Sequence, residues 1–107
     1  GGKAIPVNGD GNVTNDKDYI TIENNLEKEK KIYISRKSDV KRIKDIVETG
    51  KYKKGTCEDT PQYTIKISTG DDYDVIVSGE KIIIRKKNRE FTLEEDDAEY
   101  MRTILKR

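Results

Sequence analysis

Histidine is absent from this sequence, and cysteine occurs once, at Cys57. Histidine is the commonest general base and the commonest metal ligand in proteins, and a zinc site built on thiolates needs several cysteines. A single cysteine also excludes an internal disulfide bond. No histidine is present to activate the thiol of Cys57, and two acids, Glu58 and Asp59, follow it directly. We therefore expect no catalytic residue, no metal site and no cofactor, and we predict that the protein is not an enzyme.

A glycine-rich phosphate loop and a nucleophile elbow are missing as well. Carboxylates do cluster twice, in the segments 71–74 and 94–97. The first cluster falls in an expected turn and the second at an expected helix start, so each has a structural explanation. Neither cluster predicts the paired carboxylates of a glycoside hydrolase.

The sequence has no excess of charge of either sign. Lysine and arginine number 22, aspartate and glutamate number 21, and the formal net charge is +1. This balance produces no long-range field that would attract nucleic acid or an acidic membrane. No apolar run approaches the ~20 residues that a membrane-spanning helix needs. We therefore expect another protein, not nucleic acid or a membrane, as the partner.

Residues 1–18 form a polar leader that is rich in glycine, asparagine and aspartate. Such a composition is typical of a flexible linker. The sequence begins Gly1-Gly2-Lys3, without methionine, and we expect an export signal or a lipid anchor to precede it. The protein would then be secreted or held at the membrane as a lipoprotein, outside the cytoplasm.

The leader also contains a segment, Val7–Val13, that resembles part of an EF-hand or dockerin calcium loop. Such a loop needs oxygen ligands at alternate positions and a carboxylate at its end. With Gly11 at the invariant glycine, Pro6 takes the first ligand position and Lys17 the last. An alignment that starts at Asp10 also fails at its last ligand. A calcium-stabilised cell-surface module is therefore an alternative hypothesis only.

The clearest pattern is an alternation of apolar residues from Gln62 to Leu93. A period of two in β-branched and aromatic residues, between turns that contain glycine or asparagine, predicts the half-buried strands of an antiparallel meander. The alternating residues are Tyr63, Ile65, Ile67, Tyr73, Val75, Val77, Ile82, Ile84, Phe91 and Leu93.

The requirement that these residues share one face constrains the register of the meander. In the first hairpin we expect Ile67 opposite Tyr73, which places Lys66 opposite Asp74. In the last hairpin we expect Ile84 opposite Phe91 and Ile82 opposite Leu93.

The middle hairpin allows two registers. A tight turn at 78–79 pairs Val75 with Ile82, whereas a longer loop pairs Ile76 with Ile83. We favour the longer loop because it aligns opposite charges on neighbouring strands. The aligned residues are Lys66, Asp74, Arg85 and Glu90. Ile76 and Ile83 then form an apolar pair on the outer face, either covered by the N-terminal segment or open to a partner.

Two further strands and two helices complete the prediction. Alternation predicts strands at 19–23 and 31–35, and helical spacing of apolar residues predicts helices at 38–49 and 93–105. Ser38 is the expected cap of the first helix, and the spacing from Thr92 to Glu95 is that of a capping box at the second. The exposed face of the first helix carries Lys41, Arg42 and Lys44, which could contact a phosphate or an acidic protein.

We therefore predict one α+β domain at 19–107, an antiparallel meander sheet with two helices packed on one face, in the order β-β-α-β-β-β-β-α. In outline this order resembles small exported or lipoprotein-borne bacterial α+β domains. The leading hypothesis is a non-catalytic module that binds a protein, in the manner of an inhibitor or immunity protein. The candidate binding residues are Ile76, Ile83, Lys41, Arg42 and Lys44. The alternative from another class is a polyanion- or nucleic-acid-binding module that uses the basic helix.

Overall fold

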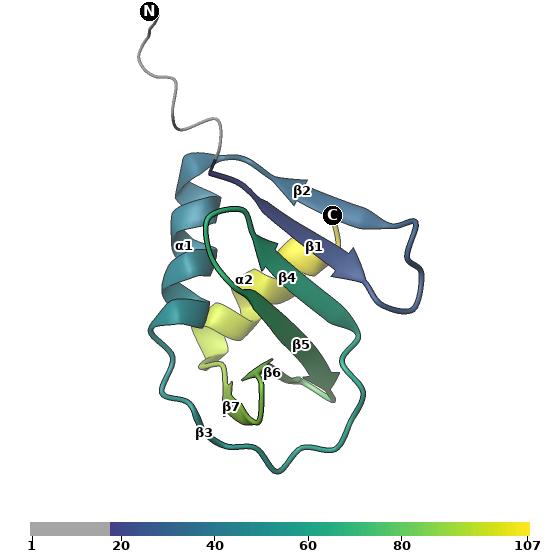
Figure 1. Cartoon of the computed structure of the whole chain (residues 1–107), viewed down its shortest axis with the longest axis vertical. Helices are drawn as coiled ribbons and strands as arrows, with labels where there is room; N and C mark the ends of the chain where they lie inside the picture. The colour runs from purple at the N-terminus through teal and green to yellow at the C-terminus, as the bar shows by residue number, and fades with distance from the viewer. Residues whose placement is uncertain (1–17) are drawn as a thin grey trace, which may run out of the picture.

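A seven-stranded antiparallel sheet forms the body of the protein, as Figure 1 shows. The computed structural model describes residues 18–107. Within this range the strands follow one another across the sheet in the order β2-β1-β4-β5-β6-β7-β3. The strands are β1 (Ile20–Asn24), β2 (Lys31–Ile34), β3 (Lys53–Lys54), β4 (Tyr63–Ile67), β5 (Asp72–Ser78), β6 (Lys81–Lys86) and β7 (Arg89–Thr92).

Two helices cover the face of this sheet that lies away from the viewer in Figure 1. Helix α1 spans Lys37–Glu48 and helix α2 spans Glu95–Leu105. The α+β class and the predicted order of strands and helices are confirmed. The structure adds β3, a strand of two residues that pairs with β7 and has no apolar residue to mark it in the sequence.

The inner layer between sheet and helices is built mainly from isoleucine and valine. The alternating residues of the meander and the apolar stripes of both helices meet in one buried cluster. Its completely buried members are Ile20, Ile43, Val47, Ile65, Val75, Ile82, Ile84, Met101 and Ile104. Each fully buried aliphatic side chain contributes about 1.5–3 kcal/mol to folding, so this cluster is what gives a chain with so many charges a stable fold.

The registers of the later hairpins are confirmed. Ile76 pairs with Ile83, and Ile84 pairs with Phe91. The middle hairpin closes through Gly79, whose φ of 63° lies in the left-handed region that glycine adopts without strain. The favoured register for this hairpin is therefore correct, but Ser78 also pairs with Lys81, so the loop has two residues, Gly79 and Glu80, and not the four that we expected.

The predicted register of the first hairpin is wrong by two residues. Ile65, not Ile67, lies opposite Tyr73, and Lys66 lies opposite Asp72, not Asp74. The turn forms earlier than expected, because the N–H of Gly70 donates to the C=O of Ile67. A shift of two keeps every side chain on its predicted face, so the apolar pattern could not distinguish the two registers.

Neither predicted helix cap is present. The cap position of α1 is Arg36 and that of α2 is Glu94, and no side chain caps either helix by a hydrogen bond. Instead, acidic side chains in the first turn interact favourably with the positive end of each helix dipole. They include Asp39 in α1 and Glu95 in α2.

Candidate functional site

The predicted apolar pair on the outer face is buried. Ile76 has no exposed surface and Ile83 is 8% exposed, so neither side chain is open to a partner. The connection between β3 and β4 lies over part of this face, because outward side chains of β6 and β7 bond to it. It lies on Glu90 of β7, where the N–H of Cys57 donates to Oε1 at 3.3 Å, and it reaches β5, where Gln62 Nε2 donates to the C=O of Val77 at 3.0 Å.

Arg85 holds the middle of this connection. Its guanidinium donates to the C=O of Cys57 at 2.9 Å and to the C=O of Asp59 at 3.2 Å. The pairing of Arg85 with Asp74 and Glu90 across neighbouring strands is as predicted. The Arg85 side chain therefore holds this connection against the sheet, a role that strand alternation alone could not predict.

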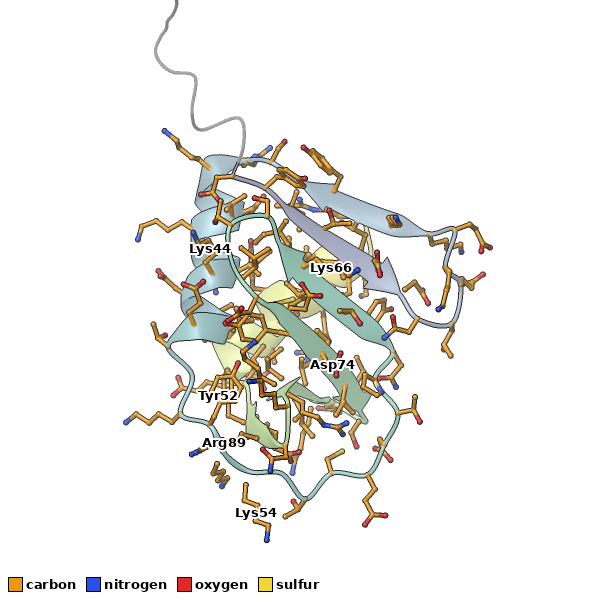
Figure 2. All side chains as sticks on the ribbon, in the orientation of Figure 1. Lys44, Tyr52, Lys54, Lys66, Asp74 and Arg89 are labelled. Carbon is orange, nitrogen blue, oxygen red and sulfur yellow. The ribbon has the colours of Figure 1, made fainter. Side chains whose placement is uncertain are left out.

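The three basic residues predicted on the first helix lie on α1, and each has a carboxylate partner. Lys41 Nζ lies 3.6 Å from Asp45, and Lys44 Nζ lies 3.8 Å from Asp18. Figure 2 shows Lys44 projecting from α1. A shallow hollow of about 600 Å³ lies beside these two lysines, but Asp45 and Glu48 also line it.

Arg42 turns from this hollow toward α2. Its guanidinium lies 3.4 Å from Asp97 and stacks over the ring of Tyr100, with its carbon 4.1 Å from the ring centre. The three predicted cations therefore do not form a single field that an anion would meet. Their positive charge is distributed over separate pairs.

Strand β2 is one edge of the sheet, because it pairs with β1 on one side only. The opposite edge is β3, which has only two residues. An edge strand presents unpaired N–H and C=O groups, and a very short edge offers a partner little to pair with. Within residues 18–107, β2 is thus the edge better suited to accept another strand.

Two large apolar side chains stand exposed in the described part of the chain, one in the edge strand and one in the connection that leads into it. Tyr33 in β2 is 62% exposed, and Leu26 in the connection between β1 and β2 is 76% exposed. Tyr33 stacks on Tyr19, with ring centres 5.1 Å apart. Sequence reasoning missed this site, although Tyr33 has the outward parity in its strand. The signal that was missing was which strand forms the edge.

The pairing of β1 with β2 shows which backbone groups of the edge are available. The N–H of Asn24 donates to the C=O of Lys30 at 3.2 Å. Hydrogen-bonded and non-hydrogen-bonded pairs alternate along an antiparallel ladder, so Ile32 and Ile34 bond to β1. The N–H and C=O groups of Lys31 and Tyr33 consequently point to the free edge.

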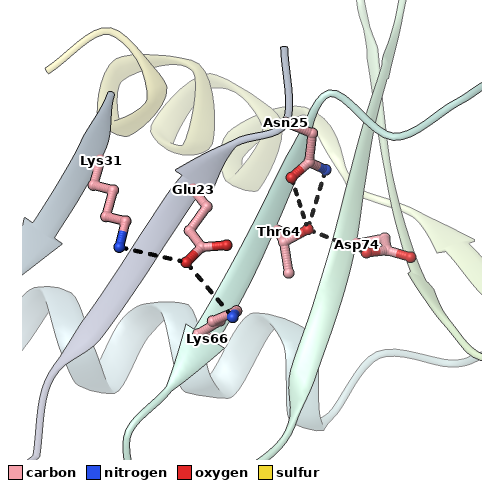
Figure 3. Close-up of polar contacts among 6 residues, drawn as sticks. All are labelled: Glu23, Asn25, Lys31, Thr64, Lys66 and Asp74. Atoms are coloured by element: carbon pink, nitrogen blue, oxygen red, sulfur yellow. Dashed lines mark hydrogen bonds and ion pairs between the residues drawn. The ribbon is translucent and has the colours of Figure 1, made fainter. Parts of the chain in front are cut away.

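The sheet face next to this edge carries a polar network, drawn in Figure 3. Glu23 Oε2 lies 3.8 Å from Lys31 Nζ and 3.5 Å from Lys66 Nζ, so one carboxylate joins β2, β1 and β4. Figure 2 shows Lys66 on the face that lies away from the helices. The first-hairpin register places Asp72, not Asp74, opposite Lys66, and the pairing of β4 with β1 brings Glu23 within reach of Lys66.

Thr64 continues this network one step along the sheet. Asn25 Nδ2 donates to Thr64 Oγ1 at 3.1 Å, and Asp74 Oδ1 accepts from the same hydroxyl at 3.4 Å (Figure 3). Exposed ion pairs and hydrogen bonds of this kind contribute little individually, but together they order the side chains of the open face. The result is a flat polar surface beside the free edge of β2.

The most strongly perturbed titratable groups lie elsewhere and are structural. Hydrogen bonds from Tyr100 and Arg107, opposed in part by burial, lower the pKa of Asp39. Burial raises the pKa of Tyr100, and so does the adjacent Asp39. Burial also raises the pKa of Tyr52, whose hydroxyl donates to the C=O of Val47 at 2.7 Å. Each of these contacts links elements of the fold.

Three further observations limit the site. The calcium hypothesis concerns Val7–Val13, which lies outside the described residues. Across residues 18–107, no group of three or more acidic or cysteine side chains is arranged to hold a metal ion. Over the same range, neither helix has the length and apolar character needed to cross a membrane.

Comparison with known proteins finds no matching family model, and no curated protein or solved structure matches the chain significantly.

Proposed function

We propose that this protein is a non-catalytic binding module that captures an extended segment of another protein at the edge strand β2. The observation that carries the proposal is Tyr33, an exposed large apolar side chain in the edge strand β2, with a second exposed one, Leu26, in the connection that leads into this strand. Main-chain hydrogen bonds supply affinity in such strand addition, and side chains supply specificity. An inhibitor- or immunity-like role outside the cytoplasm is one form of this function.

The backbone of β2 is prepared for this mode of binding. The unpaired groups of Lys31 and Tyr33 provide donors and acceptors at the spacing of a strand. The stacked ring of Tyr19 restricts the motion of Tyr33, so less conformational entropy is lost when a partner contacts the ring. A bound strand would therefore meet an ordered aromatic surface and an ordered backbone.

The proposal is tested by selecting binders from a displayed library of random short peptides and measuring their affinity for two variants. Tyr33→Pro removes the N–H that points to the free edge. Edge strands accept proline at such positions because this N–H forms no hydrogen bond to the neighbouring strand. Tyr33→Thr removes the same ring but keeps the N–H and a β-branched side chain. We expect the selected peptides to bind Tyr33→Pro at least about tenfold more weakly than Tyr33→Thr. The proline variant loses one hydrogen bond to the peptide, and the proline ring clashes with the added strand.

Equal affinity of the two variants, with circular dichroism showing both folded, would place binding elsewhere and reject the proposal. Failure of the library to yield any binder would reject it as well.

Polyanion binding through α1 is the second hypothesis from the sequence, and the geometry favours it less. Lys41, Arg42 and Lys44 each have a carboxylate within 4.0 Å, which reduces the charge they offer to an anion. Retention on heparin tests it. Strand addition predicts elution at low salt, whereas a polyanion site predicts strong retention that falls steeply as salt rises.

A further inference from the structure

A hollow of about 560 Å³ lies beside β2 on the helix side of the sheet. Its walls are β1 and β2 with their connection on one side and the last residues of α2 on the other. Figure 1 shows the C-terminal end of α2 emerging close to β2. A strand added to β2 would direct every second side chain to this side of the sheet, so the hollow would receive part of any partner that binds as proposed above.

The floor of the hollow is apolar and incompletely closed. Ile22 is 1% exposed at its base, while Ile32, Tyr63 and Leu105 pack against the core but remain only partly buried. At the other end of β2, by contrast, Ile34 is 1% exposed. The apolar side chains between the sheet and the helices are therefore fully covered at Ile34 but not at Ile32. One more apolar side chain beside Ile32 would cover them there.

The charge left unpaired around the hollow is positive. Four basic side chains and two acidic ones line it, and three of the basic ones already pair with a carboxylate: Lys30 with Glu27, Lys31 with Glu23 and Arg107 with Asp39. Among residues 18–107, Lys106 on the rim and Lys28 in the connection between β1 and β2 form no ion pair within 4.0 Å, against one unpaired acid on the rim, Glu29. Both lysines can therefore meet carboxylates of a partner.

We infer that the segment captured by β2 is acidic and places one apolar side chain inward, beside Ile32, with a carboxylate on each side of it along the same face. This inference rests on the proposed strand addition and names the chemistry of the partner. The apolar side chain would fill the open part of the inner layer. The carboxylates would lie near the unpaired lysines, Lys106 on the rim and Lys28 in the connection between β1 and β2.

A second copy of this chain fits the edge poorly. The edge strand itself carries Lys31, with Lys30 directly before it and Arg36 shortly after it. Like charges directly opposite one another destabilise a sheet, and lysine on an edge strand commonly prevents such pairing. A separate acidic segment has the complementary charge.

The inference is tested with three short end-blocked peptides in nuclear magnetic resonance titrations, which detect weak binding. The first peptide is Thr-Glu-Thr-Leu-Thr-Glu-Thr, in which the leucine and both glutamates face one side of an extended strand. The second replaces the glutamates with lysine, and the third replaces the leucine with serine. We expect the first peptide to shift the amide signals of Lys31, Tyr33 and Leu105. The serine peptide should bind at least about tenfold more weakly, because it loses one buried aliphatic side chain, and the lysine peptide should bind least.

Charge-reversal variants of the protein supply the matched comparison. Lys28→Glu and Lys106→Glu change exposed side chains at the site, and Lys51→Glu changes an exposed side chain away from it. Each of the two site variants should lower the affinity for the acidic peptide by about two- to fivefold, the value of an exposed ion pair. Each should also raise the affinity for the lysine peptide. Lys51→Glu should alter neither affinity.

The outcomes separate this inference from the proposed function. If peptides bind at β2 with no preference for glutamate or leucine, strand addition stands and the inferred chemistry is wrong. The same conclusion follows if the designed peptide fails while library peptides of another composition bind at β2. If no peptide, designed or selected, shifts the signals of Lys31 and Tyr33, both are wrong.

Discussion

The hydroxyl of Tyr100 in α2 donates a hydrogen bond of 2.6 Å to Oδ1 of Asp39 in α1. Arg107, after the end of α2, lies 3.3 Å from the other oxygen of the same carboxylate. The Asp39 carboxylate thus accepts hydrogen bonds from Tyr100 in α2 and from Arg107 just after it. This contact fastens the two helices to each other on the side of the sheet that carries the core.

Tyr100→Phe should lower the free energy of unfolding by about 1.5–3 kcal/mol, because it removes a hydrogen bond to a charged group and leaves Asp39 with one partner fewer. Urea denaturation measures the change. Tyr33→Phe is the control, since the Tyr33 hydroxyl is exposed, and it should change stability by less than about 0.5 kcal/mol. Equal losses in the two variants would show that the contact between Tyr100 and Asp39 contributes nothing.

The same contact predicts a pH dependence. The hydrogen bond from Tyr100 and the guanidinium of Arg107 hold the pKa of Asp39 below its ordinary value. A carboxyl whose pKa is lower in the folded state stabilises the fold above its unfolded pKa of about 3.9 and loses that contribution as the pH falls through its folded pKa. The stability difference between the wild type and Asp39→Asn should therefore be constant near neutral pH and should shrink below about pH 4. A difference that grows on acidification would contradict this assignment.

Gly50 should not tolerate a side chain. A Cβ atom there would overlap the ring of Phe91, which itself packs edge-on against Tyr52 with ring centres 4.7 Å apart. Gly50→Ala should therefore lower the free energy of unfolding by about 1–3 kcal/mol, as overpacking does. Gly70→Ala is the control, because a Cβ there would meet Ile67 at an ordinary distance of 3.4 Å. Thermal denaturation of both variants tests the prediction, and a Gly50→Ala variant as stable as the wild type would refute it.

Arg85 should control access to Cys57. The Arg85 guanidinium donates to the carbonyl of Cys57 on the outer face, and Cys57 is a partly buried residue. Arg85→Ala should release this segment and raise the rate at which a thiol reagent modifies Cys57 several-fold. Lys51→Ala, which changes an exposed residue outside the segment, should leave the rate unchanged. An unaltered rate in Arg85→Ala would mean that the backbone alone holds the segment in place.

Periodicity was sufficient to predict most of the fold, because each strand of the meander buries one face. It could not detect the two-residue slip in the first hairpin, since such a slip leaves Tyr73 and Ile65 on the inner face. Nor could it predict where the connection between β3 and β4 lies, because that segment is held by Arg85 and Glu90 through backbone groups and carries no apolar pattern of its own.

The candidate site depended on information that local pattern does not contain. Which strand forms an edge is set by long-range pairing, here of β1 with β4, and the sequence between them gives no sign of it. Tyr33 was therefore visible as an outward tyrosine, but not as part of a free edge. The basic residues of α1 were placed correctly on the helix, while their carboxylate partners Asp18 and Asp97 come from distant segments.

Amide hydrogen exchange along β2 tests strand addition most directly, in the free protein and with a library-selected peptide bound. In the free protein we predict rapid exchange at Lys31 and Tyr33, whose N–H groups face the free edge, and slow exchange at Ile32 and Ile34, which bond to β1. On binding, Lys31 and Tyr33 should become protected while Ile32 and Ile34 change little. Protection that appears on α1 instead, with Lys31 and Tyr33 still exchanging rapidly, would contradict the account.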